Sequence, residues 1–186
     1  MSVSLDLLTP AFIGGSQTHQ IDEYLPFRPS SIRGLLRYWF RAAVAPRLDW
    51  SDEQRAITDL KKIEETVFGS TERASPFVLL PPKTQSIRPF IQDYPPPNRQ
   101  QNPGLRYLGY GLFDRKGPPS KVLFTQEKLK SAITITFALR AKEIDGLRDV
   151  ISATIWLWTH LGGIGARSRR GWGSLRLREL LPKSSS

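Results

Sequence analysis

The chain has 186 residues, 39% of them hydrophobic, which is enough for one folded domain with a substantial core. It contains no cysteine and only two histidines, so disulfides, zinc–thiolate sites and thiol nucleophiles are excluded, and we expect neither a metal nor a cofactor. Its formal net charge of +10 favours a polyanionic partner. No apolar run is long enough to cross a bilayer and no signal peptide is recognisable, so we expect a cytoplasmic protein without membrane contact.

The first half of the chain predicts one strand and two helices. Residues 2–8 alternate polar and apolar side chains, as in a strand with one buried face. Pro29 begins a helix that runs to residue 46, because apolar residues recur at the i, i+3, i+4 spacing of a core-facing stripe. Residues 51–67 predict a second, more polar helix.

The middle of the chain predicts strands on either side of an irregular region. Strands are expected at residues 76–80 and 85–91. Residues 81–119 contain nine of the fifteen prolines, so we treat residues 81–130 as an insertion in which regular structure is broken up. Residues 132–140 alternate strictly and include β-branched side chains, which predicts a further strand.

The last third predicts a helix over residues 147–161 and a strand over residues 173–181. The complete order predicts an α+β fold of the ferredoxin-like (RRM-like) kind, βαββαβ, with an antiparallel sheet, helices on one face and a Pro-rich insertion. We expect a single domain over residues 1–181, followed by a polar tail at residues 182–186.

The positive charge is concentrated in two segments, residues 28–47 and 161–178. Together they hold ten arginines, no lysine and no acidic residue, which accounts for the whole net charge of +10. Arginine binds phosphate through a planar, bidentate fork and stacks on bases. This distribution favours a phosphate-rich partner over an ordinary solvated surface, which usually mixes Lys with Glu.

The first of these segments forms a charged stripe on the predicted helix. Arg33, Arg37 and Arg41 are spaced at i, i+4 and i+8, and no Glu lies at i±4 to neutralise them. A solvated helix flank is the alternative, but the absence of acidic neighbours favours phosphate binding. Arg28 belongs to the same segment.

The second segment begins with a glycine-rich loop, residues 161–173, which contains five glycines and three arginines. Glycine lets a backbone approach a ligand closely, and arginine reaches phosphates. Nucleotide-cofactor binding is disfavoured because the glycines follow a helix and no GxxxxGK[ST] motif exists. The loop half-matches the sheet motif of RNA-recognition domains, with Trp172 as the candidate for base stacking.

The first loop, residues 10–24, offers Gly14-Gly15 together with His19 and Asp22. A histidine near a carboxylate could serve acid–base cleavage of RNA, so an endoribonuclease that uses Asp22 and His19 is one alternative. No second acid or metal cluster supports it, and we expect a binding protein with no catalytic residue. A basic ribosomal protein is a third alternative, which shares the charge but not the glycine-rich loop.

Four motifs carry a family resemblance. They are LTPAFIGG at residues 8–15, FRPSSIRGLLRYWFRA at 27–42, FGS at 68–70 and GGIGARSRRGWGS at 162–174. In this order they resemble the RAMP superfamily, in particular the first subunit of type III-B (Cmr) CRISPR–Cas complexes. The resemblance implies a ferredoxin-like, non-catalytic subunit of an RNA-guided antiviral complex, with guide RNA near its 3′ end, target RNA and other RAMP subunits as partners.

The resemblance also implies which residues face RNA: the Gly14-Gly15 turn, the first-helix arginines and the glycine-rich loop, with the insertion as a thumb against the duplex. In relatives that cleave target RNA, the catalytic Asp lies in the loop that matches the one holding Asp22. The resembled subunit usually has a second ferredoxin-like half. The predicted RNA-binding residues are Gly14, Gly15, Arg28, Arg33, Arg37, Arg41, Gly163, Gly165, Arg167, Arg169, Arg170 and Trp172.

Overall fold

The computed structural model of the chain describes residues 1–17, 20–80, 88–94, 97–113, 120–123, 133–139 and 146–181. Within these ranges, no helix is both long and apolar enough to span a membrane. The elements in chain order are β1 (Ser2–Leu7), α1 (Pro29–Val44), α2 (Glu53–Phe68), β2 (Phe77–Leu80), β3 (Ile91–Tyr94), α3 (Pro103–Leu108), β4 (Ser120–Leu123), β5 (Ile133–Leu139), α4 (Leu147–Leu161) and β6 (Leu175–Leu181). Short 3-10 turns lie at Ala45–Arg47, Arg88–Phe90 and Ser168–Arg170.

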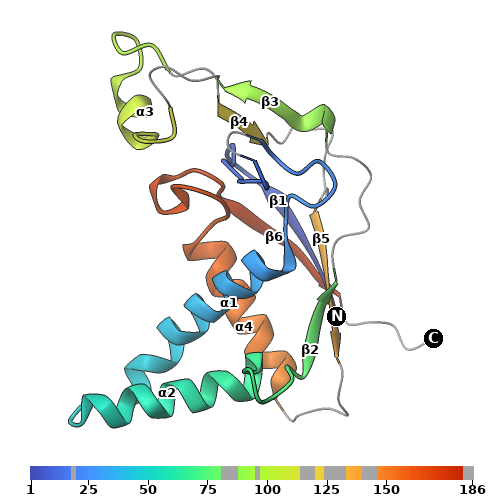
Figure 1. Ribbon diagram of the computed structural model, residues 1–186, viewed down its shortest axis with the longest axis vertical. Coiled ribbons are helices and arrows are strands. Elements are labelled where there is room, and N and C mark those ends of the chain that lie inside the picture. The colour runs from blue at the N-terminus through green and yellow to red at the C-terminus, as the bar shows by residue number, and fades with distance from the viewer. Residues whose placement is uncertain are drawn as a thin grey trace.

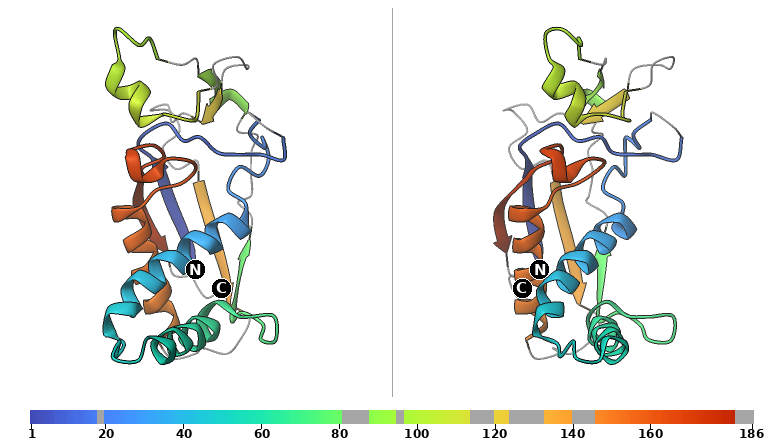
Figure 2. Two further views of the ribbon diagram at one scale, coloured as in Figure 1. Left: turned by 60° about the vertical axis from the view of Figure 1, so that its left-hand side comes forward. Right: turned by 90° about the vertical axis from the view of Figure 1, so that its left-hand side faces the viewer.

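The main sheet has four strands in the order β2-β5-β1-β6, and each neighbouring pair is antiparallel. Helices α1 and α4 lie side by side on one face of this sheet, and α2 lies at its lower end (Figure 1). A second, two-stranded sheet of β3 and β4 lies with α3 at the opposite end of the molecule (Figure 2).

The core lies between the main sheet and its two helices. Alternate residues of β1 point into it, as the sequence pattern predicts, and Val3 and Leu5 are almost fully buried. Helix α4 contributes Trp158, which is fully buried and donates a hydrogen bond from Nε1 to the carbonyl of Gly163 at 3.0 Å. The helix is therefore tied at its C-terminal end to the start of the glycine-rich loop.

Most of the predicted elements are present within a few residues of their expected bounds. The periodic helices correspond to α1, α2 and α4, and the strands at residues 2–8, 76–80, 132–140 and 173–181 correspond to the four strands of the main sheet. The strand expected at residues 85–91 is misplaced: residues 85–87 lie outside the described ranges, and the strand runs over Ile91–Tyr94. Helix α3 was not predicted, although Pro103 stands at its first turn, where proline favours a helix start.

Candidate nucleic-acid interface

The first loop and the glycine-rich loop lie against each other at one end of the main sheet. The amide of Ala166 donates to the carbonyl of Phe12, and the amide of Gly173 donates to that of Pro10, both at 2.8 Å. The first loop also pairs with β4 through Ala11. Two segments more than 150 residues apart in sequence are thereby joined into one structural unit.

Three glycines allow close backbone contacts here: Gly165 approaches the first loop, whereas Gly163 and Gly173 let the glycine-rich loop close on itself. Gly165 and Gly173 have φ angles of 82° and 62°, and a Cβ at either position would collide with a carbonyl oxygen, that of Phe12 and that of Ile164 respectively. A Cβ on Gly163 would lie 2.7 Å from the carbonyl oxygen of Gly173. Gly163 and Gly165 therefore bring the backbone close to the chain itself, and their predicted approach to a ligand stays a prediction.

The two glycines of the Gly14-Gly15 turn differ in the space around them. A Cβ on Gly15 would lie 2.7 Å from the carbonyl oxygen of Gln20, so this glycine is required by the fold of the first loop. Gly14 has open space around it and its carbonyl accepts a hydrogen bond from Arg28 Nη2 at 3.1 Å. Arg28 thus fixes the first loop to the start of α1.

Trp172, the predicted stacking residue, is buried. Only 4% of it is exposed, and its ring packs on Phe12 at a centroid distance of 4.8 Å and on Tyr94 at 5.7 Å. Phe113 completes this aromatic cluster of Phe12, Tyr94, Phe113 and Trp172. Burial raises the pKa of the Tyr94 phenol. In this structure the ring joins the lobe of β3, β4 and α3 to the glycine-rich loop, and base stacking by Trp172 stays a prediction.

The arginines of the glycine-rich loop are half-buried at Arg167 and exposed at Arg169 and Arg170. Arg167 has a left-handed backbone, with φ at 60°, and donates from Nη2 to the carbonyl of Tyr110 at 2.6 Å. Arg170 lies with Cζ 5.7 Å from the ring centre of Tyr107. Arg169 is exposed and forms no hydrogen bond or ion pair with any residue that the structure describes. These three side chains present charge on a fixed backbone.

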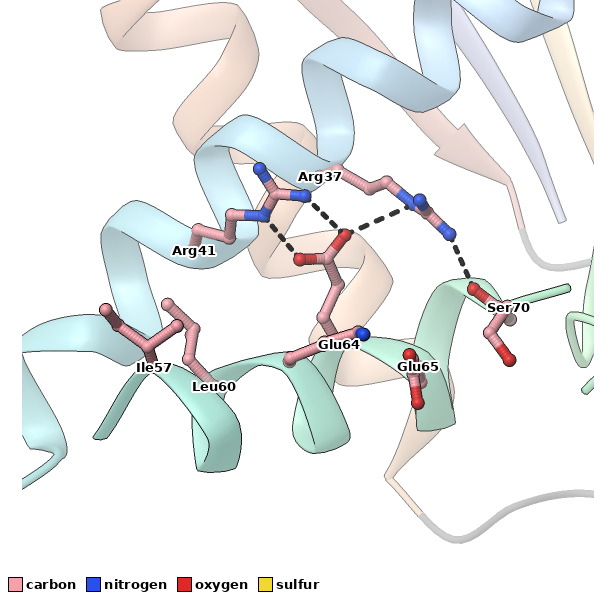
Figure 3. A pocket seen from close by; sticks show the side chains of 9 residues that line it. Arg37, Arg41, Ile57, Leu60, Glu64, Glu65 and Ser70 are labelled. Atoms are coloured by element: carbon pink, nitrogen blue, oxygen red, sulfur yellow. Dashed lines mark hydrogen bonds and ion pairs between the residues drawn. The ribbon is translucent and has the colours of Figure 1, made fainter. Parts of the chain in front are cut away.

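The arginine stripe of α1 is engaged within the protein. Arg41 forms a bidentate ion pair with Glu64 of α2, through Nε and Nη2, and Arg37 Nε lies 3.3 Å from the same carboxylate (Figure 3). The hydrogen bond to Glu64 raises the pKa of Arg41. The premise that the stripe lacks an acidic partner is wrong, because Glu64 comes from another helix and only the fold brings it to this position.

Backbone carbonyls complete the engagement of the stripe. Arg33 Nη1 donates to the carbonyl of Phe68 at 2.9 Å, and Arg37 Nη2 donates to that of Gly69. The FGS motif therefore marks the end of α2, where two arginines of α1 hold the turn into β2. A pocket of about 370 Å³ lies beside Glu64, and its lining mixes basic and acidic side chains (Figure 3).

A second carboxylate also binds two arginines. Asp6 of β1 is buried on the sheet face opposite the helices, and its Oδ2 accepts from Arg176 Nη2 at 2.7 Å and Arg178 Nε at 2.6 Å. A bulge in the pairing of β1 with β6 lies at this point. Because one carboxylate pairs with two arginines here and at Glu64, each of these three-residue clusters keeps a net charge of +1.

Of the two candidate catalytic residues, Asp22 is described by the structure and His19 is not. Asp22 is exposed, and its Oδ1 accepts from the amides of Tyr24 at 3.1 Å and Leu25 at 3.0 Å, which makes it the acceptor of a tight turn. His19 lies outside the described residues. Within the described part of the chain, no group of three or more acidic or histidine side chains could hold a metal ion.

An antiparallel sheet with helices on one face, joined to a glycine-rich loop that carries arginines, defines an α+β protein with a candidate nucleic-acid interface. Comparison with known proteins gives its family. Residues 4–176 match the family model of the RAMP superfamily, so the chain belongs to that superfamily. Two curated relatives come from Pyrococcus furiosus. The Cmr subunit Cmr1-1 is 29% identical over 169 residues, covering 87% of this chain and 45% of that protein. The subunit Cmr1-2 is 27% identical over 199 residues, covering 95% of this chain and 96% of that protein.

Solved structures share the fold. A crystal structure of Cmr1 from Pyrococcus furiosus in its apo form matches with a TM-score of 0.57 and 22% identity, over 98% of this chain and 50% of that one. A chain of the type III-B Cmr-beta complex bound to cognate target RNA matches with a TM-score of 0.53 and 16% identity, over 95% of this chain and 53% of that one. The chain thus spans about half the length of these proteins and of Cmr1-1, and nearly all of Cmr1-2.

The Glu64 cluster generates a prediction about stability. Replacing Glu64 with Gln should lower the free energy of unfolding by about 1–3 kcal/mol, because two partly buried guanidinium groups lose their charged acceptor. Urea unfolding followed by circular dichroism measures the change. Glu65→Gln, one residue away on the same helix, is the matched control and should leave stability nearly unchanged. Equal effects of the two substitutions would contradict the role given to Glu64.

The close backbone contact within the glycine-rich loop generates a second prediction. Gly173→Ala should destabilise the protein by at least about 1–3 kcal/mol, because the position has a left-handed backbone and the new Cβ would meet the carbonyl of Ile164. Gly14→Ala is the control, since a Cβ there meets nothing within 4 Å. Thermal unfolding compares the two variants. A Gly173→Ala protein as stable as wild type would show that the glycine-rich loop does not need this close backbone contact.

Proposed function

We propose that the chain is an RNA-binding subunit of a type III-B CRISPR effector complex, contacting the 3′ region of the guide RNA, the target RNA or both. We expect it to act in the cytoplasm beside other RAMP subunits. Membership of the RAMP superfamily and similarity to two Cmr1 proteins support this proposal. One observation carries it furthest: Arg167, Arg169 and Arg170 stand together on a loop that has no acidic residue and is hydrogen-bonded to the first loop.

We also propose that the main sheet with α1 and α4 is a ferredoxin-like domain over residues 1–181. Its strand order β2-β5-β1-β6 and its antiparallel pairing support this. On this account residues 81–130 are the insertion between β2 and β5, and the described part of it, β3, α3 and β4, forms the lobe that is pinned by the aromatic cluster. That lobe is the candidate for a thumb against RNA.

The proposed mechanism separates holding RNA from reading it. Arginine contacts to phosphate oxygens fix RNA in position without regard to sequence, whereas base pairing between guide and target supplies specificity. Arg169 is best placed for such contacts, because no described residue competes for its guanidinium. The α1 arginines contribute mainly by holding α2 and the turn at Phe68, with a weaker, longer-range attraction from their net charge.

The loop arginines generate a prediction about salt dependence. The logarithm of the binding constant for single-stranded RNA should fall linearly with the logarithm of the salt concentration, with a slope of about −0.7 for each phosphate contacted. Replacing Arg167, Arg169 and Arg170 with Ala should reduce that slope by up to about 2. Fluorescence anisotropy at a series of salt concentrations measures it.

The control for this experiment removes the same charge elsewhere. Lys61, Lys62 and Arg73 are exposed at the α2 end of the molecule, and their replacement with Ala should leave the slope nearly unchanged. The account fails if the loop variant keeps the wild-type slope, or if the two variants flatten it equally.

We further propose that the subunit is not itself a nuclease, because Asp22 is engaged as the acceptor of a turn. Labelled target RNA incubated with the protein and Mg²⁺ should stay intact, both with wild type and with Asp22→Asn, which keeps the acceptor and removes the charge. Mg²⁺-dependent cleavage by wild type that Asp22→Asn abolishes would instead establish the endoribonuclease alternative.

A further inference from the structure

A cluster of exposed aromatic side chains lies beside the glycine-rich loop, on α3 and the turn that follows it. Tyr107 and Tyr110 are each 71% exposed, far more than folded proteins usually allow for side chains of this size. Leu105 and Leu108 of α3 are also partly exposed. No residue of this cluster was among the predicted RNA-binding residues, since aromatic residues in a Pro-rich segment give no periodic signal.

Two arginines of the glycine-rich loop hold these tyrosines in place. Arg167 binds the backbone of Tyr110 by a hydrogen bond of 2.6 Å, and Gly111, with φ at 82°, leaves room for that guanidinium. Arg170 lies 5.7 Å from the centre of the Tyr107 ring, within the range of a cation–π contact. The tyrosines are therefore positioned by the same side chains that supply the charge.

The two described segments that carry and contact these tyrosines contain basic but no acidic side chains. Residues 97–113 contain Arg99 and Arg106 and no acidic residue, and residues 161–178 contain no acidic residue either. Tyrosine and arginine are also enriched in protein interfaces, but aromatic rings interleaved with arginines on segments without acidic residues are typical of surfaces that bind single-stranded nucleic acid. Charge complementarity therefore favours RNA over a protein partner.

We propose that Tyr107 and Tyr110 form a stacking platform for unpaired RNA bases, while Arg167, Arg169 and Arg170 neutralise the adjoining phosphates. This inference rests on the proposed RNA-binding function and adds the kind of RNA that the site takes: an unpaired stretch of any sequence. Bases within a duplex are already stacked on their neighbours and offer no free face. A ring face accepts every base, so the platform is tolerant of sequence.

The test compares two fluorescent oligonucleotides of about 12 nucleotides, one a U-rich RNA and the other an abasic oligomer with the same phosphate backbone. Wild-type protein should bind the base-bearing RNA more tightly. The double variant Tyr107→Ala/Tyr110→Ala should lose at least about 10-fold in affinity for that RNA and keep its affinity for the abasic oligomer. Tyr107→Phe/Tyr110→Phe should behave as wild type, because a ring remains.

Trp156→Ala is the matched control, since Trp156 is a half-exposed aromatic residue on α4, and it should bind as wild type. Circular dichroism establishes that each variant is folded. If wild type binds neither oligonucleotide, the proposed function fails and the platform with it. If wild type binds RNA and the double Ala variant binds it equally well, the platform alone is wrong.

Two other outcomes overturn the platform. Equal loss of affinity for both oligonucleotides would mean that the tyrosines only support the arginines. Unchanged RNA binding by the double Ala variant, together with loss of its association with other subunits of the complex, would make the surface a protein-docking site.

Discussion

The packing of the glycine-rich loop on the first loop is the contact on which the rest of the interface depends. Gly165 allows the glycine-rich loop to approach the first loop more closely than a side chain would permit, and Gly173 allows the same loop to close on itself at Ile164. That approach fixes the path of the chain from α4 to β6 and thereby the direction of three arginines. It also buries Trp172 against Phe12, which attaches the α3 lobe to the main sheet. Backbone geometry thus determines where the positive charge is displayed.

The arginines of the chain divide into two groups with different physical roles. Glu64 and Asp6 each bind two arginines, and these ion pairs hold α1 to α2 and β1 to β6. The loop arginines instead contact a backbone carbonyl, an aromatic ring or no described residue, so their charge is available to a polyanion. The total net charge of +10 therefore says less about the ligand than the loop arginines do, because these have no carboxylate partner among the described residues.

The sequence predicted the parts of the structure that depend on local periodicity. Apolar spacing located α1 and α4, and alternation located β1 and β5, because each of these elements buries one face. Glu64 could not be assigned to the α1 stripe, since 23 residues separate it from Arg41 and only helix packing brings them together. The contacts of Trp172 with Phe12 and of Gly165 with the first loop could not be predicted either, since they also join segments far apart in sequence. A glycine that fits a ligand and one that fits another loop look alike in sequence.

Photo-crosslinking of a 5-iodouridine-substituted single-stranded RNA to the full chain, mapped by mass spectrometry, tests the central claim most directly. The account predicts crosslinks in the glycine-rich loop and on α3 with its following turn, and none on the stretch of α1 that carries Arg33, Arg37 and Arg41. Crosslinks concentrated on that stretch of α1, with the glycine-rich loop unmodified, would contradict it.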